Sequence, residues 1–399
     1  MAESVAMSHY ELGTDAPWYQ GRELTEQQRA AFRARSQRSH RAKLRALSGG
    51  ATPIHPVNVP VLDPCILMPE VEGHGLSGLS LFSGGGGLDL GFDRAGYSHV
   101  ASYDTLEAAG ETLSANRPEW KVNAGESGDV RGVDWRSHRG VADIIHGGPP
   151  CQPFSTAGRQ KGARDGRNLL PQFVQSVLAT RPQAFVAENV AALSGPKFQS
   201  YLKRAFYRPL SKSYHIDTFL MSAQDYGVPQ IRRRVVFVGF RRKRDFARFE
   251  RPEPTHSATG ETIKGKLETM GARAALGLPA IDYDAAAPTI RCTLTGPRHT
   301  TSILSSASAQ RAWEKLGIWP NGVAADRAAA SAFPAKNSHF RLSVPDCALL
   351  QGFPEDWSFH GATYMALGQI GNSVAPPVGY AVAVSVAQAL HGRHWAPSR

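Results

Sequence analysis

The chain has 399 residues, 42% of them hydrophobic and 20% charged, a composition typical of a folded protein and unlike that of disordered or fibrous chains. This length is about two to three times that of a typical domain, so we expect a large lobe, a smaller lobe and a cleft between them. The formal net charge of +11 favours a polyanionic partner, although many basic proteins never bind nucleic acid.

The cysteines argue against a disulfide scaffold or a thiolate zinc site, because they are dispersed and form no Cys-x-x-Cys pair. They are Cys65, Cys151, Cys292 and Cys347. No apolar run approaches the length needed to cross a bilayer, and the first residues lack the order of charged and apolar residues in a signal peptide. We therefore predict a cytoplasmic protein that does not associate with a membrane.

Residues 1–75 differ from the rest and are interpreted as a basic N-terminal extension followed by a linker. Residues 25–28 read TEQQ, a possible capping box that predicts a helix to about residue 47. This helix carries many arginines and few acids, which indicates a solvated arm or, alternatively, a segment that contacts DNA. The proline-spaced residues 53–69 predict the linker.

From residue 76 onwards, short apolar segments alternate with amphipathic ones. The apolar segments read GLSLFS, HVASYD, ADIIHGG, QAFVAENV and RVVFVGF. Alternation of this kind predicts an α/β fold with a doubly wound, mainly parallel sheet, which we place in residues 76–247. Residues 248–338 are rich in Pro, Thr, Gly and Arg and predict a smaller irregular domain. Residues 339–399 should return to the first domain and contain a final helix at 378–390.

A glycine-rich turn follows the first apolar segment, where glycines would let a ligand approach the backbone near a helix start. Its residues include Phe82, Ser83, Gly84, Gly85 and Gly87. Turns of this type serve NAD, FAD and S-adenosylmethionine alike. Asp104 ends the next apolar segment, where an acid can bind ribose hydroxyls, and Asp129 could accept from an adenine amino group. Either acid could instead cap a turn.

The most informative motif is Gly-Gly-Pro-Pro-Cys-Gln-Pro-Phe-Ser at residues 147–155, directly after an apolar strand. Two prolines make a rigid loop at the carboxyl end of that strand, where open α/β sheets bind their ligands. A cysteine at this position is expected to be exposed and immobile. We therefore interpret Cys151 as a nucleophile rather than as a buried packing residue.

Two further motifs carry charged residues beside predicted strands. Glu188 follows an apolar strand and should lie at the same sheet edge as Cys151, although such an acid can also cap a helix. In Gln-Ile-Arg-Arg-Arg at residues 230–234, alternation would turn Arg232 and Arg234 to one side. Arg233 may be read as part of a solvated face instead.

Together with Gly-Asn-Ser-Val at residues 371–374, these motifs resemble, in order, those of the cytosine-C5 DNA methyltransferases of bacterial restriction-modification systems. The resemblance spans residues 79–390. It implies a Rossmann-like methyltransferase sheet, S-adenosylmethionine as methyl donor, double-stranded DNA as substrate and a target-recognition domain in residues 248–338. It also implies a monomer that works alongside a restriction endonuclease.

The resemblance implies a role for each catalytic residue. Cys151 would attack C6 of cytosine, Glu188 would bind N3 and the exocyclic amine, and Arg234 would hold the O2 side with Arg232 supporting it. Thiolate addition at C6 moves electron density onto C5, and hydrogen bonding at N3 lowers that barrier. No step of this chemistry needs a metal ion.

The resemblance also assigns binding residues. Those for the cofactor are Phe82, Ser83, Gly84, Gly85, Gly87, Asp104, Asp129, Pro150, Leu170, Asn372, Ser373 and Val374. The target base must leave the duplex, and Gln152 or Ser155 would fill the gap while a loop with Arg159 and Arg167 closes on phosphates. Arg291 and Arg298 would read guanine or grip phosphate.

Two alternatives remain open from the sequence. A tRNA-methylating branch of the same family shares the fold and the cysteine chemistry, although the separate loop-rich lobe and the Pro-Pro-Cys-Gln core favour DNA. A protein of a different class would be a DNA-binding regulator that acts through its basic N-terminal arm. Neither alternative changes the assignment of Cys151.

Overall fold

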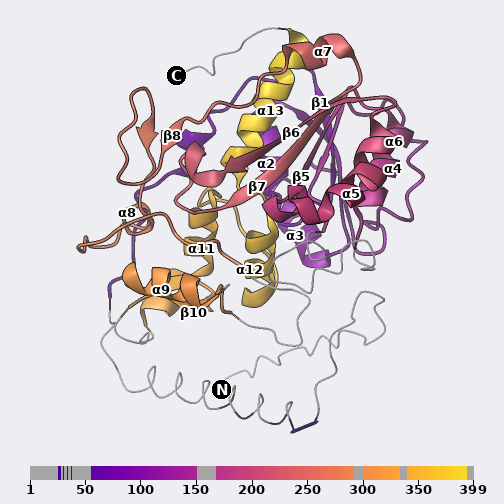
Figure 1. The fold of residues 1–399 in the computed structure, drawn as a ribbon. Helices are drawn as coiled ribbons and strands as arrows, with labels where there is room; N and C mark the ends of the chain where they lie inside the picture. Colours follow the sequence, from indigo (N-terminus) through magenta and orange to yellow (C-terminus); the bar gives the residue numbers. More distant parts are fainter. Residues whose placement is uncertain are drawn as a thin grey trace.

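The computed structural model describes residues 26, 27, 30, 34, 37, 55–150, 168–291, 301–304, 306–332 and 339–392. Its centre is a seven-stranded sheet in the order β3-β2-β1-β4-β5-β7-β6 (Figure 1). The strands are β1 Ser77–Leu81, β2 Ser98–Asp104, β3 Val122–Ala124, β4 Ile144–Gly147, β5 Ala184–Val190, β6 His215–Ser222 and β7 Arg233–Phe240. The pairs among β1 to β5 are parallel, whereas β7 runs antiparallel to β5 and β6. The predicted α/β fold is confirmed.

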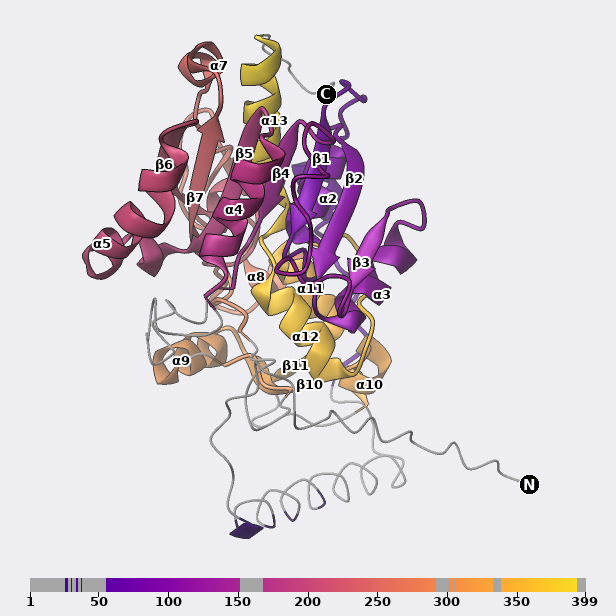
Figure 2. The same cartoon turned by 90° about the vertical axis from the view of Figure 1, so that its right-hand side faces the viewer.

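Helices cover both faces of the sheet, and the strands alternate side chains between them (Figure 2). Ile144 of β4 belongs to the core under α2 and α13, and its neighbour Ile145 belongs to the core under α4. The helices beside the sheet are α2 Gly87–Arg94, α3 Glu107–Asn116, α4 Leu170–Thr180, α5 Gln199–Leu202, α6 Arg208–Leu210, α7 Lys243–Arg248, α11 Val344–Gln351, α12 Thr363–Asn372 and α13 Pro376–His391. Short helical turns lie at Pro64–Leu67, Ala191–Ser194, Pro196–Phe198, Lys203–Tyr207 and Ala223–Tyr226.

The C-terminal helix α13 returns to the first domain and packs directly on α2. At Gly91 of α2, an added Cβ would lie 2.5 Å from the backbone nitrogen of Tyr380, so only glycine allows this approach. Residues Thr363–His391 are long and apolar enough to cross a membrane, which corrects the expectation that no stretch approaches that length. However, 72% of the apolar window is buried inside the protein, and α12 and α13 are separate helices. The stretch is therefore part of the core.

The region after α7 consists of short elements that do not join the main sheet within the described residues. They are β8 His256–Ser257, β9 Leu267–Glu268, α8 Ala272–Ala275, α9 Ala307–Lys315, β10 Ile318–Ala324 and α10 Arg327–Ser331. Strand β11 Phe340–Ser343 pairs in parallel with β10, so a two-stranded sheet crosses the boundary expected at residue 338. Ser343 then forms a capping box that begins α11.

The segment expected to be a linker is packed against the rest of the protein from residue 55 onwards. Leu62 and Met68 are buried, at 5% and 0% exposure, while Val59, three residues before Leu62, is 77% exposed. The proline-rich sequence hid this packing because it follows neither a helical nor a strand period. Most of the predicted basic helix lies outside the described residues; the five residues described between 26 and 37 are helical and exposed.

Candidate active site

A buried ion pair lies where β5 and β7 run side by side. Val190 of β5 is opposite Arg234 of β7, and Glu188 is two residues earlier on the same face. Nε of Arg234 is 2.7 Å from Oε1 of Glu188, and the two side chains are 15% and 9% exposed. Because β7 pairs with β5 in the antiparallel direction, two residues that are 46 positions apart in the sequence lie next to each other.

The carboxyl of Glu188 holds its proton more tightly than an ordinary glutamate. Burial raises its pKa, while Arg234 and Arg232 lower the pKa by a smaller amount. A carboxyl with a raised pKa that lies beside a site is a candidate proton donor, because burial disfavours its charged form. This electrostatic setting is suited to an acid that donates to a ring nitrogen.

The loop that leads to Cys151 leaves β4 directly beside Glu188. An added Cβ at Gly148 would lie 3.2 Å from Oε2 of Glu188, so the loop backbone closely approaches the carboxyl. The side-chain amide of Asn189 donates to the carbonyl of Pro149 at 2.9 Å, and Asn189 is 2% exposed. Six predicted site residues fall outside the described residues: Cys151, Gln152, Ser155, Arg159, Arg167 and Arg298.

Arg232 occupies a different environment from Arg234. It is 1% exposed, and its Nη2 donates to the carbonyls of Gly371 and Ser373 at 3.0 and 2.6 Å. The expected alternation holds, because the intervening Arg233 is exposed. Arg232 is thus bonded to the turn between α12 and α13. Its positive charge lowers the pKa of Glu188.

The glycine-rich turn and the turn after α12, which the sequence assigns to one cofactor pocket, contact each other. An added Cβ at Gly87 would lie 2.1 Å from the carbonyl oxygen of Val374, and one at Gly85 would lie 2.9 Å from Oγ of Ser373. Asn372, the last residue of α12, is exposed. The indole of Trp357 donates to the carbonyl of Gly85 at 3.1 Å, a contact that no sequence signal indicated.

The backbone of the turn after β1 is fixed by two residues with positive φ angles and by a hydrogen bond to Asp104. Phe82 and Gly84 have positive φ angles of 58° and 54°. Asp104 ends β2 and accepts from the N–H groups of Gly84 and Leu106, each at 2.8 Å, while burial raises its pKa. Each carboxylate oxygen keeps a free lone pair after these bonds, so the pair fits the hydroxyls of a ribose. Ser83 is buried beside Ser80 at 2.8 Å.

The remaining predicted cofactor residues are placed as follows. Asp129 accepts from the guanidinium of Arg131 at 2.9 and 3.0 Å, and this bonding lowers the pKa of Asp129. Its neighbour Gly128 packs on the backbone of Asp104, at 2.0 Å for an added Cβ. Leu170, the first residue of α4, is 2% exposed in the core. Pro150 is half-buried at the edge of the described loop.

A chain of buried amides connects the smaller region to the cofactor-side turn. The N–H of Ile290, next to Arg291, donates to Oε1 of Gln230 at 3.2 Å, and Nε2 of Gln230 donates to Oε1 of Gln351 at 2.8 Å. Nε2 of Gln351 then donates to the carbonyl of Ser373 at 2.8 Å. Arg291 itself is partly exposed. Sequence reasoning missed Gln351, because its partners lie far away along the chain.

Comparisons with known proteins agree with this geometry. Residues 76–388 match the family described as C-5 cytosine-specific DNA methylase. The chain is 34% identical over 314 residues to the type II methyltransferase M.NgoMIV of Neisseria gonorrhoeae, covering 78% of this chain and 97% of that protein. It is 34% identical over 323 residues to M.NaeI of Lentzea aerocolonigenes, covering 78% and 75%.

The fold also has solved counterparts. A candidate DNA modification methyltransferase encoded within an E. coli prophage has a TM-score of 0.53 at 23% identity, covering 79% of this chain and 100% of that one. At this identity the likeness concerns the fold alone. Because the family match extends from the strand before the glycine-rich turn to the last helix, the chain belongs to the C-5 cytosine-specific DNA methylase family and is a DNA cytosine-5 methyltransferase.

Proposed function

We propose that this enzyme takes its methyl group from S-adenosylmethionine and transfers it to C5 of a cytosine flipped out of a specific duplex sequence. The observation that carries the proposal is the ion pair of Glu188 and Arg234 against the loop that begins at Gly148. Asn189 fixes Pro149, two residues before Cys151, at the sheet edge that carries Glu188, which supports placing the proposed acid and the proposed nucleophile together.

Cys151 is proposed to add to C6 of the ring as the thiolate. The new S–C6 bond places the ring electrons on C5, and Glu188 donates its proton or a hydrogen bond to N3, which stabilises the negative charge that develops. Arg234 keeps Glu188 in place and is proposed to face the O2 side of the ring. C5 would use those electrons to bond the methyl group, whose bond to the donor sulfur breaks with its electron pair left on sulfur. Loss of the C5 proton to a base, with return of the N3 proton to Glu188, then lets the S–C6 bond break, and the thiolate leaves.

S-adenosylmethionine, when bound, supplies a methyl carbon that its sulfonium makes electrophilic. The donor set fits this molecule: the carboxylate of Asp104 suits ribose hydroxyls, and the contact between the glycine-rich turn and the turn after α12 supplies two walls. The residues proposed to hold S-adenosylmethionine are the twelve cofactor residues that the resemblance assigns, of which Phe82 is the first and Val374 the last. Asp129 would have to leave Arg131 to accept from an adenine amino group.

The proposed division of labour places chemistry on residues 76–247 and 339–391, and reading of neighbouring bases on residues 248–338 with Arg291 and Arg298. Gln152, Ser155, Arg159 and Arg167 are proposed to contact the DNA around the flipped base. The relatives are named as type II methyltransferases, which supports pairing with a restriction endonuclease. We further propose a cytoplasmic monomer.

The decisive experiment is methyl transfer from labelled S-adenosylmethionine to duplex DNA and, in parallel, to tRNA. We expect duplex DNA to be the substrate and Cys151→Ser to abolish both turnover and the covalent complex with DNA containing 5-fluorocytosine, in which fluorine replaces the C5 proton and cannot be removed by a base. Cys65→Ser is the matched control, since Cys65 is half-buried in the helical turn Pro64–Leu67, outside the strands that carry Glu188 and Arg234. Transfer to tRNA alone, or a persistent adduct with Cys151→Ser, would overturn the proposal.

A further inference from the structure

Residues 55–71, here named the strap, run from the smaller region to the end of α2. The strap lies before the part of the chain that matches the family, which begins at residue 76. At one end the backbone N–H groups of Val61 and Leu62 both donate to the carbonyl of Ala275 in α8, at 3.0 and 3.2 Å. Gly277 has a φ of 67°, and an added Cβ there would lie 1.9 Å from the carbonyl oxygen of Val59. The strap therefore rests directly on the end of α8.

The other end of the strap is fixed to the cofactor side. Nε of Arg94, the last residue of α2, donates to the carbonyl of Met68 at 2.6 Å, and the N–H of Val71 donates to the carbonyl of Arg94 at 2.9 Å. Met68 is fully buried in the core that contains α2 and α13. Since α2 begins in the glycine-rich turn, one continuous segment connects α8 to the helix of the proposed cofactor pocket.

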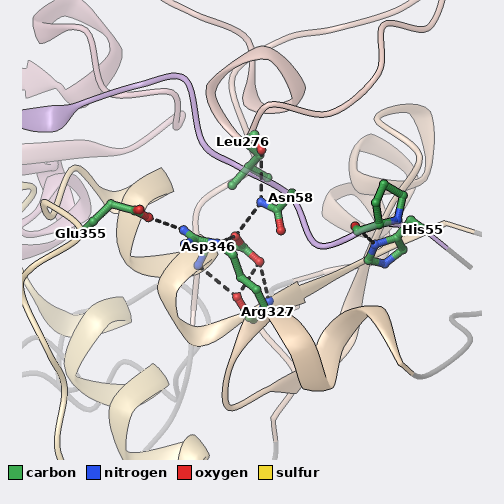
Figure 3. A network of polar contacts seen from close by, with 8 residues as sticks. His55, Asn58, Leu276, Arg327, Asp346 and Glu355 are labelled. Atoms are coloured by element: carbon green, nitrogen blue, oxygen red, sulfur yellow. Dashed lines mark hydrogen bonds and ion pairs between the residues drawn. The ribbon is translucent and has the colours of Figure 1, made fainter. Parts of the chain in front are cut away.

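At the α8 end of the strap, a single side-chain amide joins the strap, the residue after α8, and α11 (Figure 3). One nitrogen of Asn58 donates to the carbonyl of Leu276 at 3.1 Å and to Oδ1 of Asp346 in α11 at 3.0 Å. Leu276 follows α8, where helix carbonyls have no partner within the helix, and the amide supplies one. Asn58 is 8% exposed and Asp346 is 0% exposed, so water cannot replace these bonds easily.

Asp346 collects bonds from both sides of the expected domain boundary. Its Oδ1 also accepts from Nε of Arg327 in α10 at 2.9 Å, and its Oδ2 accepts from the N–H and the hydroxyl of Ser343 at 2.8 and 2.6 Å. The same guanidinium contacts Glu355 (Figure 3). A buried carboxylate needs such a full set of donors, and the loss of one is costly because the charge stays buried.

We propose that Asn58 is a positioning residue for DNA recognition: it locks α8 to α11, so that the base-reading region keeps a fixed angle to the cytosine site. The inference rests on the proposed function, in particular on residues 248–338 reading the DNA. Asn58 touches neither DNA nor the reacting atoms. Its amide fits because only a side chain with two hydrogens on one nitrogen bonds both acceptors at once.

The test compares Asn58→Asp with the wild type on duplex DNA, after the modified cytosines of the wild type have been mapped. The aspartate keeps the shape and loses both donors. We expect KM for DNA to rise about tenfold and discrimination against near-cognate sites to fall by a similar factor, with kcat and the Kd for S-adenosylmethionine within about twofold. Asn58→Ser, which keeps one donor, should give an intermediate result and guards against a variant that does not fold.

Two controls separate positioning from stability. Val59→Ser changes an exposed side chain of the strap and should match the wild type in KM and in discrimination. Arg327→Met removes a second donor to Asp346. The rise in KM of the double variant should therefore be smaller than the combined effects of Arg327→Met and Asn58→Asp measured separately. Additive effects, or an Asn58→Asp enzyme with wild-type KM and discrimination, would overturn the inference. A wild type that methylates no duplex DNA would instead overturn the proposed function.

Discussion

The main sheet and the region from 248 to 338 hold their residues in place by different means. In the sheet, side chains such as Ile144 and Ile145 alternate between two hydrophobic cores, and neighbouring strands exchange regular backbone bonds. The smaller region also packs apolar side chains such as Trp313 into the first of these cores, and individual polar contacts fix its short elements in addition. Nη1 and Nη2 of Arg273 donate to the carbonyls of Leu316 and Pro279 at 2.7 and 2.6 Å. Strand register thus places the groups on the sheet, whereas the short elements of the smaller region depend more on single contacts between distant residues.

The largest effect is expected from Glu188→Gln, which tests whether chemistry belongs to the sheet alone. The amide keeps the shape but cannot give up a proton, so kcat should fall about a thousandfold, as for loss of a general acid. Single-turnover methyl transfer measures this fall. The set of methylated sequences should stay unchanged, because Glu188 lies outside the proposed base-reading region. Glu111→Gln on the exposed face of α3 is the control. A changed recognition sequence would contradict the comparison.

The sequence predicted the residues that lie in or next to an apolar strand. It did not predict contacts between residues that are far apart along the chain. Glu188 and Arg234 were predicted because each follows or begins an apolar run. Strands β3 and β6 were missed: they form the two edges of the sheet, and β6 shows His215 and Leu220 to solvent instead of forming a continuous apolar run. Contacts such as Trp357 with Gly85 join distant positions through tertiary packing, which no local pattern encodes.

A second prediction concerns a buried histidine in strand β4 of the sheet. His146 of β4 is 2% exposed and stacks on Phe92, with ring centroids 4.2 Å apart. Burial lowers the pKa of His146 to about 3 from 6.5. The native state therefore stays neutral while the unfolded state binds a proton, so this histidine's contribution to stability falls as pH drops from 6.5 towards 3.

His146→Phe should remove that loss while keeping the stacked ring. We compare the free energy of unfolding of the variant with that of the wild type. From pH 6.5 to pH 5, this difference should shift by about 2 kcal/mol in favour of the variant. Denaturant unfolding at several pH values measures the difference. Leu220→Val, at an exposed position on β6 without a titratable group, should run parallel to wild type. Parallel curves for His146→Phe would show that the histidine is not neutral in the folded protein.

The smallest effect is expected at the joint between the two regions. Gln351→Met breaks the chain of amides from Gln230 to Ser373, but each partner keeps another bond: Gln230 still donates to the carbonyl of Leu350, and Ser373 still accepts from Arg232. Stability should fall by about 1 kcal/mol. The affinity gain that cognate DNA gives to S-adenosylmethionine should shrink about fivefold, measured by calorimetry with and without DNA. Gln175→Met, exposed on α4, is the control. An unchanged gain would show that the two regions bind their ligands independently.

The pairing of β10 with β11 has a consequence for protein engineering. A chimera that exchanged only residues 248–338 with those of a relative would carry β10 away while leaving its partner strand behind. It would also replace α8 and Arg327 while Asn58 and Asp346 stayed with the recipient. We therefore expect that a graft meant to change specificity and keep activity has to include the strap and extend through β11, so the portable unit is discontinuous and combines two stretches of the chain.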